Sequence, residues 1–163
     1  ETGGSTGWQR LGRLLLKIGQ VNKAEELYSI LLEQGSNEDE KAFYYNQLGV
    51  AKVTQGDYKK AIWYYKRGLV IIERALPSNH PNLATSYNNI GMLYKQMGDY
   101  SKALSLYEKA LEIYKKTLHQ NHPHFAASYS NIGCVYDNMG EYSTALSFYE
   151  KALNIRQKTL SSN

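Results

Sequence analysis

A period of 42 residues runs through most of this chain and limits its fold more than any other feature. Gly49, Gly91 and Gly133 lie 42 residues apart, and a shorter step of 37 residues extends the series back to Gly12. The same steps relate three further series, which are Gly19–Gly56–Gly98–Gly140, Ala24–Ala61–Ala103–Ala145 and Tyr28–Tyr65–Tyr107–Tyr149. Periods of this length indicate an array of similar supersecondary units. We therefore expect four repeats, at about residues 8–37, 42–76, 84–118 and 126–160.

Each repeat has the pattern of two helices joined by a short turn. In the third repeat, Tyr87, Ile90 and Tyr94 follow the i, i+3, i+7 spacing of one buried helix face. Gly98 then interrupts this pattern, and glycine suits the left-handed conformation that ends many helices. Asp99 is a candidate cap for the next helix, whose apolar positions are Ala103, Leu104, Tyr107, Ala110, Leu111 and Tyr114. The sequence therefore predicts an all-α chain of helical hairpins.

Small residues, tyrosines and prolines fit this arrangement. Gly91 and Gly133 allow the paired helix to approach closely, because they carry no side chain. Pro81 and Pro123 suit the first turn of a helix, where a missing N–H leaves no hydrogen bond unmade. Tyrosines are expected to fill the space between neighbouring helices, with hydroxyls that reach water or a backbone carbonyl; these are Tyr94, Tyr107, Tyr136 and Tyr149.

The repeated residues resemble a known family, the tetratricopeptide repeat (TPR). In the fourth repeat its motif reads Tyr129, Ile132, Gly133, Tyr136, Glu141, Tyr142, Ala145, Tyr149 and Ala152. The 42-residue period, longer than the usual length of about 34, is similar to the variant found in kinesin light chains. The resemblance implies a right-handed superhelical solenoid of four hairpins that works as a protein-binding scaffold or adaptor. Similar arrays accompany ADP-ribosyltransferase or NTPase domains in larger proteins.

The first two repeats depart from the motif. Lys52 stands where the later repeats have tyrosine, and Gly68 stands where they have alanine. In the first repeat, Leu15 and Val21 replace tyrosines. Degenerate terminal repeats are expected, since an end unit has a neighbour on one side only.

Both ends of the chain carry expectations of their own. Residues 1–7 are small, polar and rich in glycine, so we expect a linker or cloning scar there, followed by the array at 8–163. At the other end, Leu160–Asn163 aligns with Leu76–Asn79 and Leu118–Asn121. Each of those two segments is followed by a His-Pro pair and another repeat. We therefore expect a fragment of a longer protein, whose last helix exposes apolar surface available for self-association.

A ligand is expected on the first helix of each hairpin, because these helices line the concave wall of a stacked array. Their positions not needed for packing form the candidate binding groove. These positions are Gln9, Arg10, Arg13 and Lys17 in the first repeat; Asn46, Gln47, Val50 and Thr54 in the second; Asn88, Asn89, Met92, Lys95 and Gln96 in the third; and Ser130, Asn131, Cys134, Asp137 and Asn138 in the fourth.

Two features of this set suggest what binds. Gln47, Asn89 and Asn131 recur at the repeat step, and an amide offers both the donor and the acceptor that an extended peptide backbone requires. Arg10, Arg13 and Lys17 share one face and would favour an acidic segment or a free C-terminus. The alternative stays open for both groups, since each also fits an ordinary solvated helix face.

Other classes of function find little support in the sequence. His119, His122 and His124 cluster in one connector, but His122 repeats His80 and so has a structural source rather than a metal-binding one. Cys134 has apolar repeat partners and no sign of a catalytic histidine nearby. We therefore expect that the protein is not an enzyme and that it binds no metal ion or cofactor. The net charge of +4 is scattered over helix faces, so nucleic acid is not expected, and no apolar run is long enough to cross a membrane.

The sequence thus favours a protein-interaction scaffold that holds an extended peptide in a concave groove. The second hypothesis is a structural spacer or self-association arm of a larger ADP-ribosyltransferase or NTPase. A single cysteine and the absence of any Asn-x-Ser/Thr glycosylation site favour a cytoplasmic protein.

Overall fold

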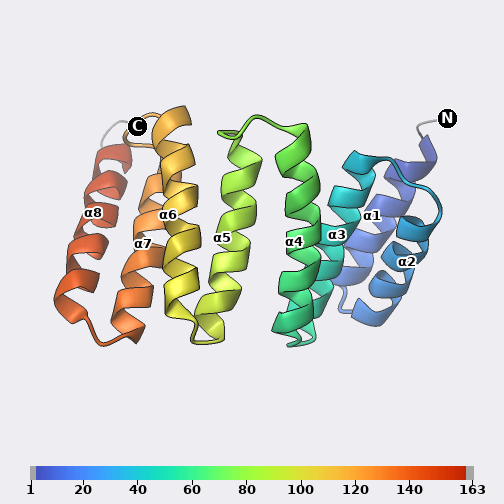
Figure 1. The fold of residues 1–163 in the computed structure, drawn as a ribbon, viewed down its shortest axis with the longest axis horizontal. Coiled ribbons are helices and arrows are strands. Elements are labelled where there is room, and N and C mark those ends of the chain that lie inside the picture. Colours follow the sequence, from blue (N-terminus) through green and yellow to red (C-terminus); the bar gives the residue numbers. More distant parts are fainter. Residues whose placement is uncertain (1–2, 161–163) are drawn as a thin grey trace. The chain divides into compact units, whose positions relative to one another are not determined.

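The described part of the chain, residues 3–160, consists of helices joined by short connections (Figure 1). The structure is a computed structural model, and its side chains are described from residue 7 onward. Its helices are α1 (Gly3–Lys17), α2 (Val21–Glu33), α3 (Glu38–Thr54), α4 (Tyr58–Ala75), α5 (Pro81–Gln96), α6 (Tyr100–Thr117), α7 (Pro123–Asn138) and α8 (Tyr142–Leu160). They pair in order into four hairpins, which confirms the predicted all-α repeat solenoid. The hand of the predicted superhelix stays a prediction.

The first helix begins earlier than the sequence suggests. Residues 1–7 were expected to be a linker, but α1 starts at Gly3, and residues 1 and 2 lie outside the described part. Glycine and serine are poor helix formers, yet each residue added to an existing helix gains one hydrogen bond once the nucleus has formed. The helix that Trp8 and its neighbours begin therefore continues backward into this segment.

The turn inside each hairpin depends on a glycine in the left-handed conformation. Gly98 has a φ of 78°, and the N–H of Asp99 donates to the carbonyl of Tyr94 at 2.9 Å, which closes the end of α5. The carboxylate of Asp99 then accepts a hydrogen bond from the N–H of Lys102 in the first turn of α6. Both predicted roles, the glycine that ends one helix and the aspartate that caps the next, are confirmed.

The last two connections between hairpins end on a His-Pro pair, whereas α3 is capped by Asn37. Pro81 and Pro123 occupy the first position of α5 and α7, as predicted. The histidine before each proline caps the helix: Nδ1 of His122 accepts a hydrogen bond from the N–H of His124 at 3.2 Å, and His80 does the same for Asn82. The repeated histidine therefore has a structural role at the helix N-terminus.

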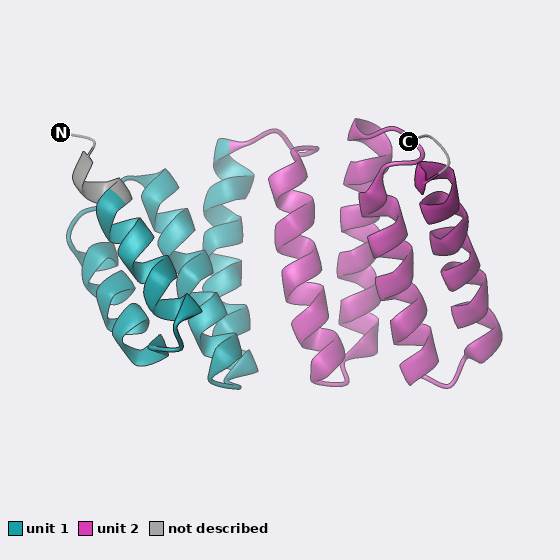
Figure 2. Ribbon diagram, turned by 180° about the vertical axis from the view of Figure 1, so that it is seen from behind, with its two compact units in different colours: residues 1–75 teal, residues 76–163 magenta. Residues whose placement is uncertain are grey.

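The chain divides into two compact units, Glu1–Ala75 and Leu76–Asn163 (Figure 2). In the first unit, the core lies between α2 and α3, where Ala24, Tyr28, Tyr44 and Leu48 are buried together. In the second unit, α5 to α8 pack as two successive hairpins, and Tyr107 and Tyr114 are among the buried side chains of α6.

Within each hairpin, a tyrosine of the second helix packs against a glycine of the first. A Cβ added to Gly91 would lie 3.0 Å from the ring of Tyr107, and one added to Gly133 would lie 3.0 Å from the ring of Tyr149. The prediction that these glycines allow close approach is therefore confirmed. The ring of the facing tyrosine occupies the space that a side chain would need.

The tyrosines differ from one another more than the sequence suggests. Tyr107 is fully buried and its hydroxyl has no hydrogen-bond partner among the described residues, so the expectation that each hydroxyl reaches water or a carbonyl is wrong for this residue. Burial, with a smaller contribution from Cys134, raises the pKa of Tyr107 to about 12. Tyr94 and Tyr136 are only half-buried, and Tyr149 is exposed.

Candidate protein-binding surface

The amides singled out by the repeat lie on a partly exposed stripe of α5 and α7. On α5, Asn89, Met92 and Gln96 follow one another at i, i+3 and i+7, and each is exposed or half-buried. On α7, the repeat-equivalent positions hold Asn131, Cys134 and Asn138, again exposed or half-buried. The side chains of Gln47, Asn89 and Asn131 make no hydrogen bond with any other group of residues 7–160. These three amides therefore keep donors and acceptors for another molecule.

The amide next to each of these points in another direction. Nδ2 of Asn88 donates to the hydroxyl of Tyr114 on α6 at 3.4 Å, and Oδ1 of Asn88 is buried. Asn46 lies at the equivalent place on α3, where its Oδ1 would be 3.5 Å from a Cβ on Gly68 of α4. Ser130 is the half-buried counterpart on α7. Asn46 and Asn88 therefore sit at the contact between the two helices of a hairpin, and Ser130 holds the equivalent position.

One predicted site residue joins α5 to α7. Nζ of Lys95 donates to Sγ of Cys134 at 3.4 Å, and both side chains are half-buried. Cys134 also lies between two tyrosines: it contributes to the raised pKa of Tyr107, and burial together with Cys134 raises the pKa of Tyr149. The contact brings the stripes of α5 and α7 side by side within the second unit. Asp137, on the same face, is exposed.

The first unit places the predicted basic residues on the exposed side of α1. Arg10, Arg13 and Lys17 are all exposed, and the guanidinium of Arg13 lies 5.9 Å from the centre of the Phe43 ring on α3. Gln9 is half-buried, and its backbone carbonyl accepts a hydrogen bond from Tyr28. On α3, Gln47 is half-buried, Val50 is exposed, and the hydroxyl of Thr54 is bonded to the carbonyl of Val50.

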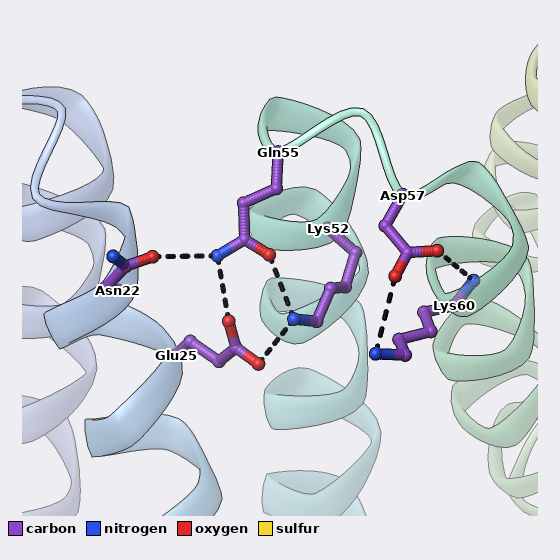
Figure 3. Close-up of polar contacts among 6 residues, drawn as sticks. All are labelled: Asn22, Glu25, Lys52, Gln55, Asp57 and Lys60. Carbon is purple, nitrogen blue, oxygen red and sulfur yellow. Dashed lines mark hydrogen bonds and ion pairs between the residues drawn. The ribbon is translucent and has the colours of Figure 1, made fainter.

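A polar network between α2 and α3 was not predicted from the sequence (Figure 3). Nζ of Lys52 lies 2.6 Å from Glu25 and donates to Oε1 of Gln55 at 2.9 Å. Nε2 of Gln55 donates to Glu25 at 2.9 Å and to Asn22 at 3.0 Å. Because Lys52 is almost fully buried, the network supplies the partners that its charge needs at this interface.

Two residues that differ from their repeat equivalents could have indicated this network in the sequence. Lys52 stands where α7 has Tyr136, and Glu25 stands where α6 has Leu104. An apolar pair has thus been replaced by an ion pair at one junction between hairpins. Burial alone would raise the pKa of the Glu25 carboxyl, but hydrogen bonds from Lys52 and Gln55 and the charge of Lys52 outweigh it and lower the pKa.

The histidine cluster of the connector is engaged in packing. The ring of His124 stacks on Tyr114 with centroids 4.9 Å apart, and the rings of His122 and His124 are 4.7 Å apart. Among the described residues, no group of three potential metal ligands comes together. No helix within residues 3–160 has the length and apolar character to cross a membrane.

Family models match most of the chain. Two models of the tetratricopeptide repeat match residues 40–116 and 125–163. A comparison with curated proteins finds no match to this sequence.

Several solved structures share the fold at low sequence identity. BtubC (BKLC) from P. vanneervenii superposes with a TM-score of 0.85 at 28% identity; the match covers 95% of this chain and 64% of that one. A kinesin light chain with nearly identical TPR-like repeats from Podosopora anserina gives 0.77 at 25% identity, covering 94% and 75% of the two chains. MamA gives 0.74 at 25% identity, covering 99% and 83%.

The family models and these structures agree with the period found in the sequence. Proteins built from such repeats act in general as protein-interaction scaffolds. The chain belongs to the tetratricopeptide repeat family, in its kinesin-light-chain-like form.

Proposed function

We propose that this protein binds an extended segment of another protein along α5 and α7, the first helices of the two hairpins of its second unit. The observation that carries the proposal is the stripe of α5 and α7, where Asn89 and Asn131 recur at the repeat step without a hydrogen-bond partner among the described residues. Met92 and Cys134 follow each amide by one turn and offer apolar contact. An extended peptide presents a backbone N–H and a backbone carbonyl at each residue, which are the groups that an amide pairs with.

The basic side chains of α1 suggest the charge of the partner. Arg10, Arg13 and Lys17 are exposed on one helix, and α1 has no acidic residue in its described part. An acidic segment would be attracted to this helix, and the attraction would weaken at high salt because the charges are exposed.

Removal of the two amides tests the proposed surface. A peptide library is screened against the protein, and the hits are measured again with the double variant Asn89→Ala and Asn131→Ala. Each lost hydrogen bond is worth about 1 kcal/mol, so affinity should fall roughly tenfold to thirtyfold. The matched control replaces two exposed polar residues of α8, Asn154→Ala and Gln157→Ala, and should bind as the unmodified protein does. Hits that survive the first pair unchanged would show that the surface lies elsewhere.

A second candidate function, self-association, has its own observation in its favour. On α8, Tyr142, Leu146 and Leu153 form an exposed apolar stripe, whereas the equivalent positions of α6, Tyr100, Leu104 and Leu111, are buried or half-buried. Leu153 is 55% exposed, whereas its repeat equivalent Leu111 is 7% exposed. This face of α8 has the apolar composition of a surface that packs against the first helix of another hairpin.

The opposite end offers the complementary surface. Leu11 and Leu14 of α1 hold the repeat positions of Ile132 and Val135 on α7; Leu14 is 53% exposed and Val135 is fully buried. In a solution of this chain alone, we propose that α1 of one copy covers α8 of another, as α7 covers α6 within the chain.

A further inference from the structure

A second concave surface lies in the first unit, between α3 and α4, and shares no residue with the stripes described above. It encloses about 540 Å³. Six residues, here called the Trp63 face, account for its character: Tyr45 of α3 with Trp63, Lys66, Arg67, Val70 and Arg74 of α4. The α4 members follow a spacing of three or four residues and therefore lie along one side of that helix.

Aromatic and apolar groups form the floor of this face. The rings of Tyr45 and Trp63 meet edge to face with centroids 6.5 Å apart, and the guanidinium of Arg67 lies 4.9 Å from the centre of the Trp63 ring. Trp63 is nevertheless 51% exposed, and Val70 is exposed as well. A large aromatic side chain left half open to solvent beside cations is typical of a binding surface.

The other hairpins show that the scaffold does not need three of these residues, Trp63, Lys66 and Val70. The other three recur in kind, because a tyrosine stands at the place of Tyr45 and lysines stand at the places of Arg67 and Arg74. At the repeat-equivalent positions of α6 stand Ser105 for Trp63, Glu108 for Lys66 and Glu112 for Val70. The compared positions of α4 therefore carry three cations and no acid, whereas the same positions of α6 carry two cations and two acids. Glu73, one turn after Val70, does not line the groove. On α8, a serine again replaces the tryptophan and a glutamate again replaces Lys66. The fold of a hairpin therefore does not require Trp63, Lys66 or Val70.

Because α4 lacks the glutamates of α6, two of its arginines have no carboxylate partner among the described residues. On α6, Nζ of Lys116 pairs with Glu112 at 2.7 Å. On α4 the equivalent cation is Arg74, and Val70 takes the place of the glutamate. Within residues 7–160, neither Arg67 nor Arg74 lies within ion-pair distance of a carboxylate. Lys41, at the edge of the groove, is already paired with Glu38 at 2.8 Å.

From these observations we propose that the Trp63 face binds an acidic protein segment that carries a large apolar side chain. The apolar side chain packs between Trp63 and Val70, and flanking carboxylates take the guanidinium groups of Arg67 and Arg74, which suit carboxylates because they donate two parallel hydrogen bonds. Val70, exposed beside Trp63, is matched by an aliphatic side chain, which a protein segment carries and a nucleic acid lacks. A protein segment therefore fits better than a nucleic acid.

The binding test uses a defined probe. The background protein carries Trp8→Phe, so that Trp63 is the only tryptophan and its fluorescence reports on this face. The probe is a capped peptide of four Glu-Glu-Leu units, and we expect saturable binding in the micromolar range with a change in Trp63 emission. The double variant Arg67→Glu, Arg74→Glu should bind at least tenfold more weakly. Trp63→Ser, which installs the residue found on α6 and α8, should weaken binding at least fivefold when measured with a labelled peptide.

The repeat supplies a charge-matched control. Lys109→Glu with Lys116→Glu makes the same change at the equivalent positions of α6 and should leave binding within twofold of the background protein. Equal losses from the charge reversals on α4 and α6 would overturn the proposal, as would no saturable binding at all. A thymidine oligonucleotide that binds more tightly than the peptide would overturn the assignment to a protein segment.

Discussion

Gly49 and Gly68 are helical glycines of the same hairpin, yet their surroundings differ. A Cβ on Gly49 would lie 2.6 Å from the ring of Tyr65, so the ring would have to move. A Cβ on Gly68 would meet nothing closer than the carbonyl oxygen of Ala42 at 3.3 Å. The repeat agrees with this difference, because glycine recurs at the first place in every hairpin, whereas alanine takes the second place in α6 and α8.

Opposite effects on stability follow for the two substitutions. Gly49→Ala should lower the free energy of unfolding by about 1–3 kcal/mol, the usual cost of overfilling a packed core. Gly68→Ala should raise it by about 0.5–1 kcal/mol, because alanine favours the helix. Urea unfolding followed by circular dichroism measures both. A loss of stability from Gly68→Ala as large as that from Gly49→Ala would show that the helices pack too tightly at Gly68 for any side chain.

At the scale of elements, the junction between α2 and α3 depends on Lys52 and Glu25. Lys52→Tyr installs the residue that α7 has at this place but leaves Glu25 half-buried and without its cation. We expect a loss of about 1–3 kcal/mol, the cost of leaving a buried polar group without its partner. The double variant with Glu25→Leu, which copies the apolar pair of α6 and α7, should recover most of that loss. A double-mutant cycle by urea unfolding measures the coupling, and additive effects would argue against a joint role.

The same pair gives a dependence on pH with a definite sign. The pKa of Glu25 is lowered in the folded state from its ordinary value of 4.5, so its stabilising effect is present above that value. The effect is lost as the pH falls through the lowered pKa. The double variant should therefore lose less stability on acidification than the unmodified protein.

Several helices were predictable because their boundaries have a local cause. Gly98 and Asp99 determine where α5 ends and α6 begins, and Pro123 determines where α7 begins. These effects are local and do not depend on tertiary packing. The start of α1 was not predictable in this way, since Gly3 carries no start signal and the helix reaches it only by extension from residues further along.

The candidate site was less predictable because it depends on how two helices cross. Asn88 and Asn89 are adjacent and chemically identical, and both lie at the edge of the buried face of α5. Which of them points to α6 is determined by the position of Tyr114, which the spacing does not reveal. The Trp63 face, in contrast, left a trace in the sequence. Trp63, Lys66 and Val70 differ from their α6 equivalents, Ser105, Glu108 and Glu112, in one direction, toward a basic and apolar surface.

At the scale of the whole molecule, self-association should join unlike ends. Leu14→Glu places a charge on the α1 surface, and Leu153→Glu places one on the α8 surface. Each variant alone should remain monomeric in analytical ultracentrifugation, because every contact between α1 of one copy and α8 of another would include the charged substitution. Mixed together they should form a one-to-one dimer and nothing larger, since each supplies one intact end. The unmodified chain should form longer assemblies as its concentration rises, because an interface between unlike surfaces does not close on itself.

A charge at an exposed position away from both ends provides the control. Val50→Glu on α3 should assemble as the unmodified chain does. Dimers formed by either end variant alone would indicate a symmetric contact between like surfaces and contradict the head-to-tail arrangement.

The buried lysine between the first two hairpins also restricts how a gene for such an array can change length. Unequal recombination that removes the second hairpin would place Glu25 opposite Tyr94 and would remove Lys52, the cation that pairs with it. Duplication of the fourth hairpin would instead place Leu146 opposite a second copy of Tyr136, the same combination that α6 and α7 already use. Descendants of this protein should therefore gain or lose repeats after the second hairpin, while the first two are inherited as a pair.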